Sequence, residues 1–148
     1  MPADPTNQYV ATLREKYKGG DATERSYYSA LEALLRGSGA GLRAISEPKR
    51  SECGAPDFHV KKRDLIIGHI EAKDLGASLD EAEKSEQIKG RYRPALPNLI
   101  LTNFVEFRWY VNGDHRKTIR LGEVADHHKL KLQFLALSRG SVYDRLCT

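Results

Sequence analysis

The sequence predicts a single α/β domain in which helices flank a mixed central β-sheet. Apolar residues recur at helical spacing before Gly37. Short segments rich in β-branched and aromatic residues follow between Asp57 and Leu121, and one helical pattern interrupts them. Because sheets and helices each bury an apolar face against another layer, this order of elements predicts helices packed on a sheet.

Two helices are expected at the start of the chain. The first should extend over about Tyr9–Tyr17, with Asn7 as its N-cap. The second should follow Asp21 and end at Gly37. Its apolar stripe, with a spacing typical of one helix face, consists of Tyr27, Tyr28, Leu31, Leu34 and Leu35.

A β-hairpin is expected after a loop rich in Gly, Ser and Pro. Its strands are predicted at Asp57–Lys61 and Leu65–Lys73, and Arg63 and Asp64 form the turn between them. A weaker strand pattern, Leu42–Ile45, precedes the hairpin. The hairpin therefore brings Asp57 toward the end of the second strand.

One more helix and further strands complete the prediction. Ser78 and Glu81 have capping-box spacing and open a polar helix that should continue to about Tyr92, before Pro94. The later strands are predicted at Asn98–Thr102, Val105–Val111 and Thr118–Leu121, with a hairpin turn at Asn112-Gly113. The segment 127–148 fits a strand or a helix equally well.

Length and composition indicate one domain over residues 1–148. The chain has 148 residues, of which 40% are hydrophobic and 30% charged. We expect a cytoplasmic protein, because no apolar run predicts a membrane span and the N-terminus does not resemble a secretory signal. Cys53 and Cys147 fit neither a zinc site nor a disulfide framework. The net charge of +4 permits a polyanionic partner but is weak evidence by itself.

Three charged residues stand among apolar ones at the predicted hairpin. Side chains alternate along a strand, so Glu71 and Lys73 project to one face, and the hairpin can bring Asp57 beside them. Two converging carboxylates suit Mg²⁺, which keeps several waters and takes its other ligands from phosphate. Such an ion stabilises charge on a phosphate and lowers the pKa of an attacking water, and Lys73 could orient that water.

A competing interpretation is that these residues have no joint role. An isolated Glu-x-Lys pattern is far more often a surface charge pair, and Pro56-Asp57 alone is an ordinary turn. Their conjunction favours a site, because Asp57 follows a proline and precedes a strand, while Glu71 and Lys73 end a hydrophobic strand. A buried charge needs a partner or a metal ion.

These residues resemble the motif of the PD-(D/E)xK nuclease superfamily, which includes many restriction enzymes, repair nucleases and junction resolvases. Further segments resemble the N-terminal nuclease domain of single-chain restriction-modification enzymes. They are Thr23–Tyr28, Gly54–Phe58, Ile70–Asp74, Pro97–Asn103 and Glu106–Tyr110. Those enzymes continue into helicase or methyltransferase parts, so this chain would be an excised domain, a truncated relative or a stand-alone nuclease.

The resemblance covers about residues 21–121 and implies a restriction-endonuclease-like core there, with a metal site within it. Asp57 and Glu71 would be metal ligands, the carbonyl of Ala72 would be a third, and Lys73 would be the catalytic lysine. Glu24, on the first core helix, would complete the metal shell. An alternative role for Glu24 is helix capping, because it has capping-box spacing from Asp21.

The resemblance also implies a catalytic role for Gln87, on the polar helix. In many superfamily members a tyrosine follows this glutamine by four positions, whereas Tyr92 follows Gln87 by five. We therefore expect Gln87 to border the active site and Tyr92 to pack in the core.

DNA is the expected partner. Among the basic residues, Arg91 and Arg93 follow Gln87 closely and are the preferred phosphate contacts, with Lys61 and Lys62 as further candidates at the hairpin turn. Cutting both strands usually needs two active sites, so a second copy of the chain or a larger restriction-modification partner is also expected.

The leading hypothesis is a Mg²⁺-dependent DNA endonuclease, with Mn²⁺ as a substitute ion, that acts in restriction or in defence against foreign DNA. One alternative is a catalytically silent DNA-binding or assembly module. Another is an exonuclease or RNA nuclease on the same scaffold, which the sequence does not separate from the first.

Overall fold

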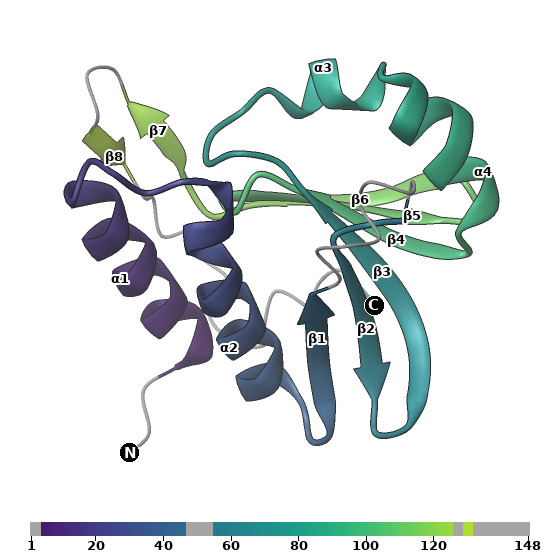
Figure 1. Cartoon of the computed structure of the whole chain (residues 1–148), viewed down its shortest axis with the longest axis horizontal. Helices are drawn as coiled ribbons and strands as arrows, with labels where there is room; N and C mark the ends of the chain where they lie inside the picture. The colour runs from purple at the N-terminus through teal and green to yellow at the C-terminus, as the bar shows by residue number, and fades with distance from the viewer. Residues whose placement is uncertain (1–3, 47–54, 126–128, 132–148) are drawn as a thin grey trace.

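A computed structural model of the chain describes residues 4–46, 55–125 and 129–131. Its main sheet consists of β1 (Leu42–Ser46), β2 (Phe58–Lys62), β3 (Leu65–Ala72), β4 (Asn98–Thr102), β5 (Glu106–Val111) and β6 (Asp114–Arg120). The strands lie side by side in sequence order (Figure 1). All neighbours are antiparallel except β3 and β4, which are parallel, so the sheet is mixed. The predicted fold class is confirmed.

The first helix, α1 (Pro5–Lys18), begins earlier than expected. The side chain of Asp4 accepts a hydrogen bond from the backbone N–H of Thr6, and Pro5 occupies the first helical turn, where its missing N–H costs nothing. The expected N-cap, Asn7, is therefore wrong and lies within the helix.

The second helical segment is divided into η1 (Glu24–Tyr27), a 3₁₀ turn, and α2 (Tyr28–Ser38). Its start is organised by Thr23 and Ser26, because the Ser26 hydroxyl accepts from the backbone N–H of Thr23 at 2.9 Å. The expected capping box between Asp21 and Glu24 is therefore wrong. Glu24 instead occupies the first turn of η1.

The connection between the parallel strands β3 and β4 contains three short helical pieces instead of one helix. They are α3 (Leu79–Glu83), the π-helix η3 (Glu86–Tyr92) and α4 (Arg93–Ala95). Ser78 caps α3 as predicted, but the chain leaves the helix at Lys84, and Ser85 caps η3 through the backbone N–H of Ile88. The prediction of one continuous helix to Tyr92 is wrong because a second cap residue lies within it.

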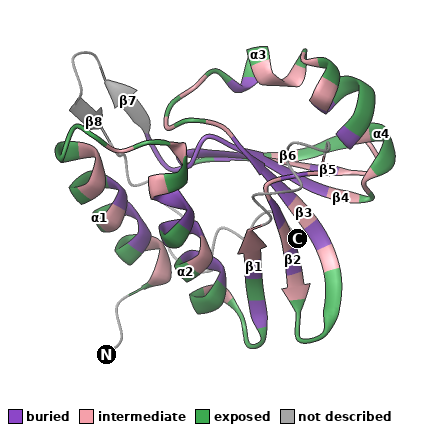
Figure 2. Ribbon diagram, in the orientation of Figure 1, coloured by how far each residue is buried: buried purple, intermediate pink, exposed green. Residues whose placement is uncertain are grey.

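The sheet separates two apolar clusters. The larger cluster joins α1 and α2 to one face of all six strands, and its largest fully buried side chains include Tyr27, Phe58 and Leu31. The smaller cluster joins α3 and η3 to the other face of β4 and β5. Buried residues, purple in Figure 2, run through the central strands and along α2. Alternation along β4 divides its residues between the clusters, since Ile100 lies in the larger one and Leu99 and Leu101 in the smaller.

The tail is described only in part. A small second sheet pairs β7 (Glu123–Ala125) with β8 (Lys129–Lys131). The remainder of the segment 127–148, for which strand and helix were left open, lies outside the described residues. No helix in the described part of the chain is long and apolar enough to cross a membrane.

A buried hydrogen bond connects α1 to the loop between β4 and β5. The Tyr9 hydroxyl donates to the carbonyl of Phe104 at 2.6 Å, and Tyr9 is 2% exposed. We predict that Tyr9→Phe lowers the free energy of unfolding by about 1–3 kcal/mol, because the buried carbonyl loses its partner. Urea denaturation measures this change. Tyr17→Phe, at a half-buried position of the same helix, is the control and should change stability by less than about 0.5 kcal/mol; equal effects of the two variants would contradict the assignment.

Candidate active site

The start of β2 and the end of β3 are joined by two reciprocal hydrogen bonds. The backbone N–H of Asp57 donates to Oε1 of Glu71 at 3.1 Å, and the backbone N–H of Ala72 donates to Oδ2 of Asp57 at 2.9 Å. The antiparallel register, which pairs Phe58 with Ile70, places the two segments opposite each other. Each carboxylate is thus oriented by the backbone of the other strand, and the predicted pair is brought together.

Lys73 lies where β3 leaves the sheet. Its Nζ lies 3.4 Å from Oε2 of Glu71 and 3.4 Å from Oε1 of Gln87, and its backbone N–H donates to the carbonyl of Thr102 at 2.8 Å. The side chain of Lys73 is 29% exposed and that of Glu71 is 6% exposed, so the ammonium lies between the buried carboxylate and solvent. The structure therefore places three predicted residues, Glu71, Lys73 and Gln87, in one connected group.

The π-helix accounts for the unexpected spacing of Gln87 and Tyr92. A π-helix has i→i+5 hydrogen bonds, so residues five positions apart face the same side. Nε2 of Gln87 accordingly donates to the Tyr92 hydroxyl at 3.1 Å. Tyr92 is buried in the smaller cluster, as expected, but it also fixes the amide that faces Lys73. Single π-turns recur at functional sites, where they change which side chains face one another.

Burial and crowding make the Glu71 carboxylate easy to protonate. Burial first, and then the charge of Asp57, raise the pKa of Glu71 from its ordinary value of 4.5 to about 8, while Lys73 opposes the rise. Burial and the charge of Asp57 also raise the pKa of Glu24. Glu71 therefore holds a proton at neutral pH, because its ionised form would be buried beside the charge of Asp57, and a bound cation would favour the ionised form.

The donor set fits a magnesium ion with few protein ligands. Asp57, Glu71 and the carbonyl of Ala72 offer oxygen donors, which Mg²⁺ prefers, and it completes its shell with water and phosphate. Among the described residues, no three side chains of His, Cys, Asp or Glu form a cluster that could hold a metal. The charges of Asp57 and Lys73 shift the pKa of Glu24 in opposite directions, but Glu24 forms no such cluster with them. Its role as a metal ligand therefore stays a prediction.

Tyr28 is a neighbour of the site that the sequence identified only as a core residue. Its ring packs on Phe58, with centroids 4.6 Å apart, and the guanidinium of Arg25 lies 5.7 Å from its centroid. Burial, and then the charges of Asp57 and Glu24, raise the pKa of its hydroxyl. The spacing of four positions from Glu24 is the sequence feature that could have placed Tyr28 here, since residues so spaced share a helix face.

The predicted DNA contacts are divided between two places. Arg91 is exposed on η3, on the same element as Gln87. The guanidinium of Arg93 donates to the carbonyl of Gly113 at 2.8 and 3.1 Å and lies over the ring of Tyr110 at 4.6 Å, so it links α4 to the β5–β6 turn. Lys61 and Lys62 lie at the far end of β2 from Asp57. All four contacts with DNA stay predictions.

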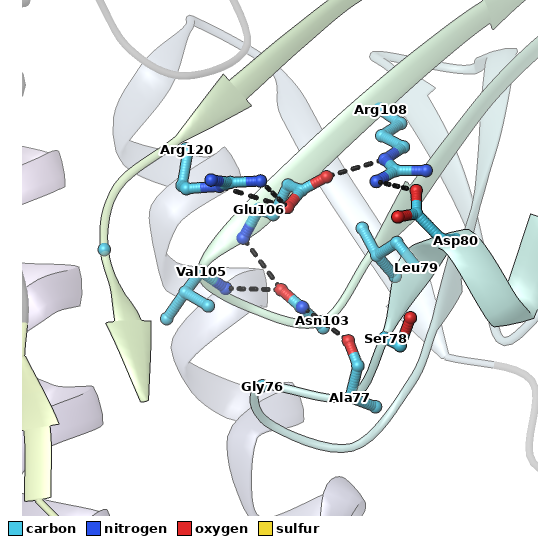
Figure 3. Close-up of a pocket in the computed structure, with 11 residues that line it drawn as sticks. Gly76, Ala77, Ser78, Leu79, Asp80, Asn103, Val105, Glu106, Arg108 and Arg120 are labelled. Carbon is cyan, nitrogen blue, oxygen red and sulfur yellow. Dashed lines mark hydrogen bonds and ion pairs between the residues drawn. The ribbon is translucent and has the colours of Figure 1, made fainter. Parts of the chain in front are cut away.

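A separate pocket of about 260 Å³ lies beside the loop that follows Lys73 (Figure 3). Arg108 donates to carboxylates of Asp80, Glu83 and Glu106 at 2.6–2.9 Å, and Arg120 pairs with Glu106 at 2.9 Å. The cationic groups at this pocket are thus already neutralised. Because Asp80 and Glu83 belong to α3 and Glu106 to β5, this network anchors the connection that carries Gln87.

The loop itself is held by Asn103, in one of the segments that motivated the family resemblance. Its side-chain amide donates to the backbone carbonyl of Ala77 at 2.7 Å, and its backbone carbonyl accepts from the N–H of Gly76 at 3.3 Å. Together with the bond from Lys73 to Thr102, these contacts fix the chain directly after the candidate catalytic lysine.

Comparison with known proteins supports the fold at low sequence identity. No protein-family model matches the chain, and no curated protein matches it. A solved structure described as the cryoEM structure of a DrdV–DNA complex matches with a TM-score of 0.60 and 22% sequence identity. The match covers 78% of this chain and 12% of the other. The chain thus shares its fold with a small part of a protein that was solved in complex with DNA.

The raised pKa of Glu71 predicts how stability depends on pH when divalent ions are chelated. Between pH 4.5 and about 8 the folded chain holds a proton on Glu71 that the unfolded chain releases. This contribution is therefore fully present below pH 4.5 and is lost as the pH rises through 8. Denaturation of wild type and Glu71→Gln in chelator across this range measures it. The wild type should lose stability relative to the variant as the pH rises, and parallel curves would contradict the shift.

Proposed function

We propose that the chain is a Mg²⁺-dependent phosphodiesterase that hydrolyses DNA. The observation that carries the proposal is the connected group of Asp57, Glu71, Lys73 and Gln87, formed by residues from two strands and a helix. A buried carboxyl group held beside a second, half-buried one is costly for a fold and is typical of sites with a chemical task.

The protein's own groups would have two roles, which are to hold the metal ion and to orient the reacting groups. Asp57, Glu71 and the Ala72 carbonyl would hold the ion, which when bound supplies charge stabilisation at the phosphate and a more acidic water. A lysine ammonium has three hydrogens to donate. Two point toward Glu71 and Gln87, so the third is available to a phosphate oxygen or to the attacking water.

Gln87 would act as a positioning residue for this lysine. Its amide oxygen faces Nζ of Lys73, and its amide nitrogen is fixed by Tyr92. Since the amide is held on both sides, it limits the directions in which the ammonium can turn. Small errors in such placement slow a reaction considerably.

DNA is proposed as the substrate on three grounds. The chain carries a net charge of +4, the motif resembles that of a superfamily rich in DNA nucleases, and the fold matches part of a protein solved with DNA. We propose a role in restriction or defence against foreign DNA. The matching region makes up 12% of the DrdV chain, which is consistent with a cleavage module that works beside other domains or partners.

Loss of the lysine or of the first carboxylate should abolish cleavage. We predict that Lys73→Ala and Asp57→Ala reduce the cleavage rate of plasmid and linear DNA in Mg²⁺ by at least about 10²-fold, the effect of removing a group that positions a proton or a charge. Lys84→Ala is the control, because Lys84 is an exposed lysine that pairs with the exposed Glu81. Gel assays in Mg²⁺, Mn²⁺ and chelator measure the rates.

The same assay separates this proposal from its alternatives. If the wild type cuts no faster than either variant, the proposal of an enzyme fails for that substrate. DNA binding without cutting would favour a silent binding or assembly module. A parallel RNA substrate and a closed circular substrate distinguish an RNA nuclease and an exonuclease from a DNA endonuclease.

A further inference from the structure

The face of β1 and β2 that points away from α1 and α2 carries a line of polar residues that ends at the candidate active site. Buried Phe58 and Val60 face the helices, so alternation sends His59 and Lys61 to the opposite face. Asp57 lies directly before the strand, at the end of this line. We call the face that carries His59 and Lys61 the outer face.

Two positive charges lie opposite each other on the outer face. Arg43 of β1 is the cross-strand partner of Lys61, and its buried neighbours Leu42 and Ala44 face the helices. Like charges directly opposite on a ladder destabilise a sheet. In the described part of the chain neither Arg43 nor Lys61 has an ion-pair partner, and both reach solvent. An external anion would offset the repulsion.

The row between this basic pair and the carboxylates carries two histidines beside Ile45 of β1. His59 of β2 is the cross-strand partner of His69 of β3, and both are partly exposed. His69 lies two positions before Glu71 on the strand, so it shares the face of that carboxylate. Imidazole N–H groups can donate hydrogen bonds to phosphate. Polar groups therefore follow one another from Glu71 to Lys61 without an acidic residue between them.

The second helical layer does not cover this part of the sheet. The cluster beneath α3 and η3 contains residues of β4 and β5 and none of β1 or β2. Figure 1 shows the same arrangement, with α3 and α4 over the far half of the sheet from β1. As far as the described residues extend, the outer face of β1 and β2 has no helix packed on it.

We propose that the outer face binds the DNA backbone to one side of the cleaved bond, with Arg43 and Lys61 contacting phosphates. This inference rests on the proposed function, because it assumes that the cleaved bond lies at Asp57 and Glu71. Four residues of strand separate Asp57 from Lys61, which is about 13 Å at about 3.3 Å per residue. DNA rises about 3.4 Å per base pair, so the contact falls about four base pairs from the cut.

Salt-dependent DNA binding in chelator tests the contact without requiring cleavage. A fluorescent duplex is titrated with wild type and with the double variant Arg43→Gln/Lys61→Gln at several salt concentrations. Each lost phosphate contact should make the slope of log K against log salt less steep by about 0.9, so the double variant should lose roughly 1.8. Thermal melting confirms that the variant is folded.

Two control variants separate this face from general positive charge. Arg116→Gln/Lys117→Gln removes one exposed arginine and one half-buried lysine, as the test variant does, but at the opposite edge of the sheet on β6. It should keep the wild-type slope. Lys62→Gln changes the neighbouring lysine. The cross-strand partner of Lys62 is Leu42, which faces the helices, so this variant should lose less DNA affinity than Lys61→Gln.

The outcomes distinguish failure of this inference from failure of the proposed function. The outer-face contact is wrong if the Arg43→Gln/Lys61→Gln variant and the β6 control have the same salt slope. It is also wrong if Lys61→Gln and Lys62→Gln bind DNA with the same affinity. Neither result contradicts the proposed nuclease activity. If the wild type binds DNA through Arg43 and Lys61 but never cuts, the contact stands and the proposed chemistry fails. If the wild type neither binds nor cuts DNA, both are overturned.

Discussion

The candidate site depends on the reciprocal hydrogen bonds between Asp57 and the end of β3. Two carboxylates would normally turn away from each other, but each here accepts a backbone N–H from the opposite segment, at 3.1 and 2.9 Å. Such charge-assisted bonds are among the stronger ones in proteins. They do not offset the burial of Glu71 and the charge of Asp57, which together raise the pKa of Glu71, and the ammonium of Lys73 approaches this carboxylate. The site is therefore organised to accept positive charge.

Much of this arrangement could be predicted because it depends on local patterns. The β-branched and apolar segments predicted the strands, and the alternation of side chains placed Glu71 and Lys73 on one face. The prediction that Asp57 would approach them required only a hairpin with a short turn, which the structure has. The position of residues within one hairpin can thus be predicted from the sequence. The contact of Gln87 with Lys73 could not, because it depends on how η3 packs against the sheet.

The predicted helix boundaries that were wrong lie where two local signals compete. Asn7 and Asp4 are both good caps, and the proline after Asp4 decided between them. Ser85 interrupts a polar helix that Ser78 had already capped, and the segment after it forms a π-helix. A single π-turn inserts one residue into a helix and does not change its composition. The spacing of apolar residues therefore does not reveal it. The five-residue separation of Gln87 from Tyr92 was its only trace in the sequence.

We propose that Asp57 and Glu71 together bind a divalent metal ion. The most direct measurement is a Mn²⁺ titration followed by electron paramagnetic resonance, which reports the free ion, at a pH above 8, where Glu71 is ionised. We predict that the wild type binds Mn²⁺, that Mg²⁺ displaces it, and that Asp57→Asn and Glu71→Gln each abolish binding. Equal binding by the wild type and either variant would contradict the claim.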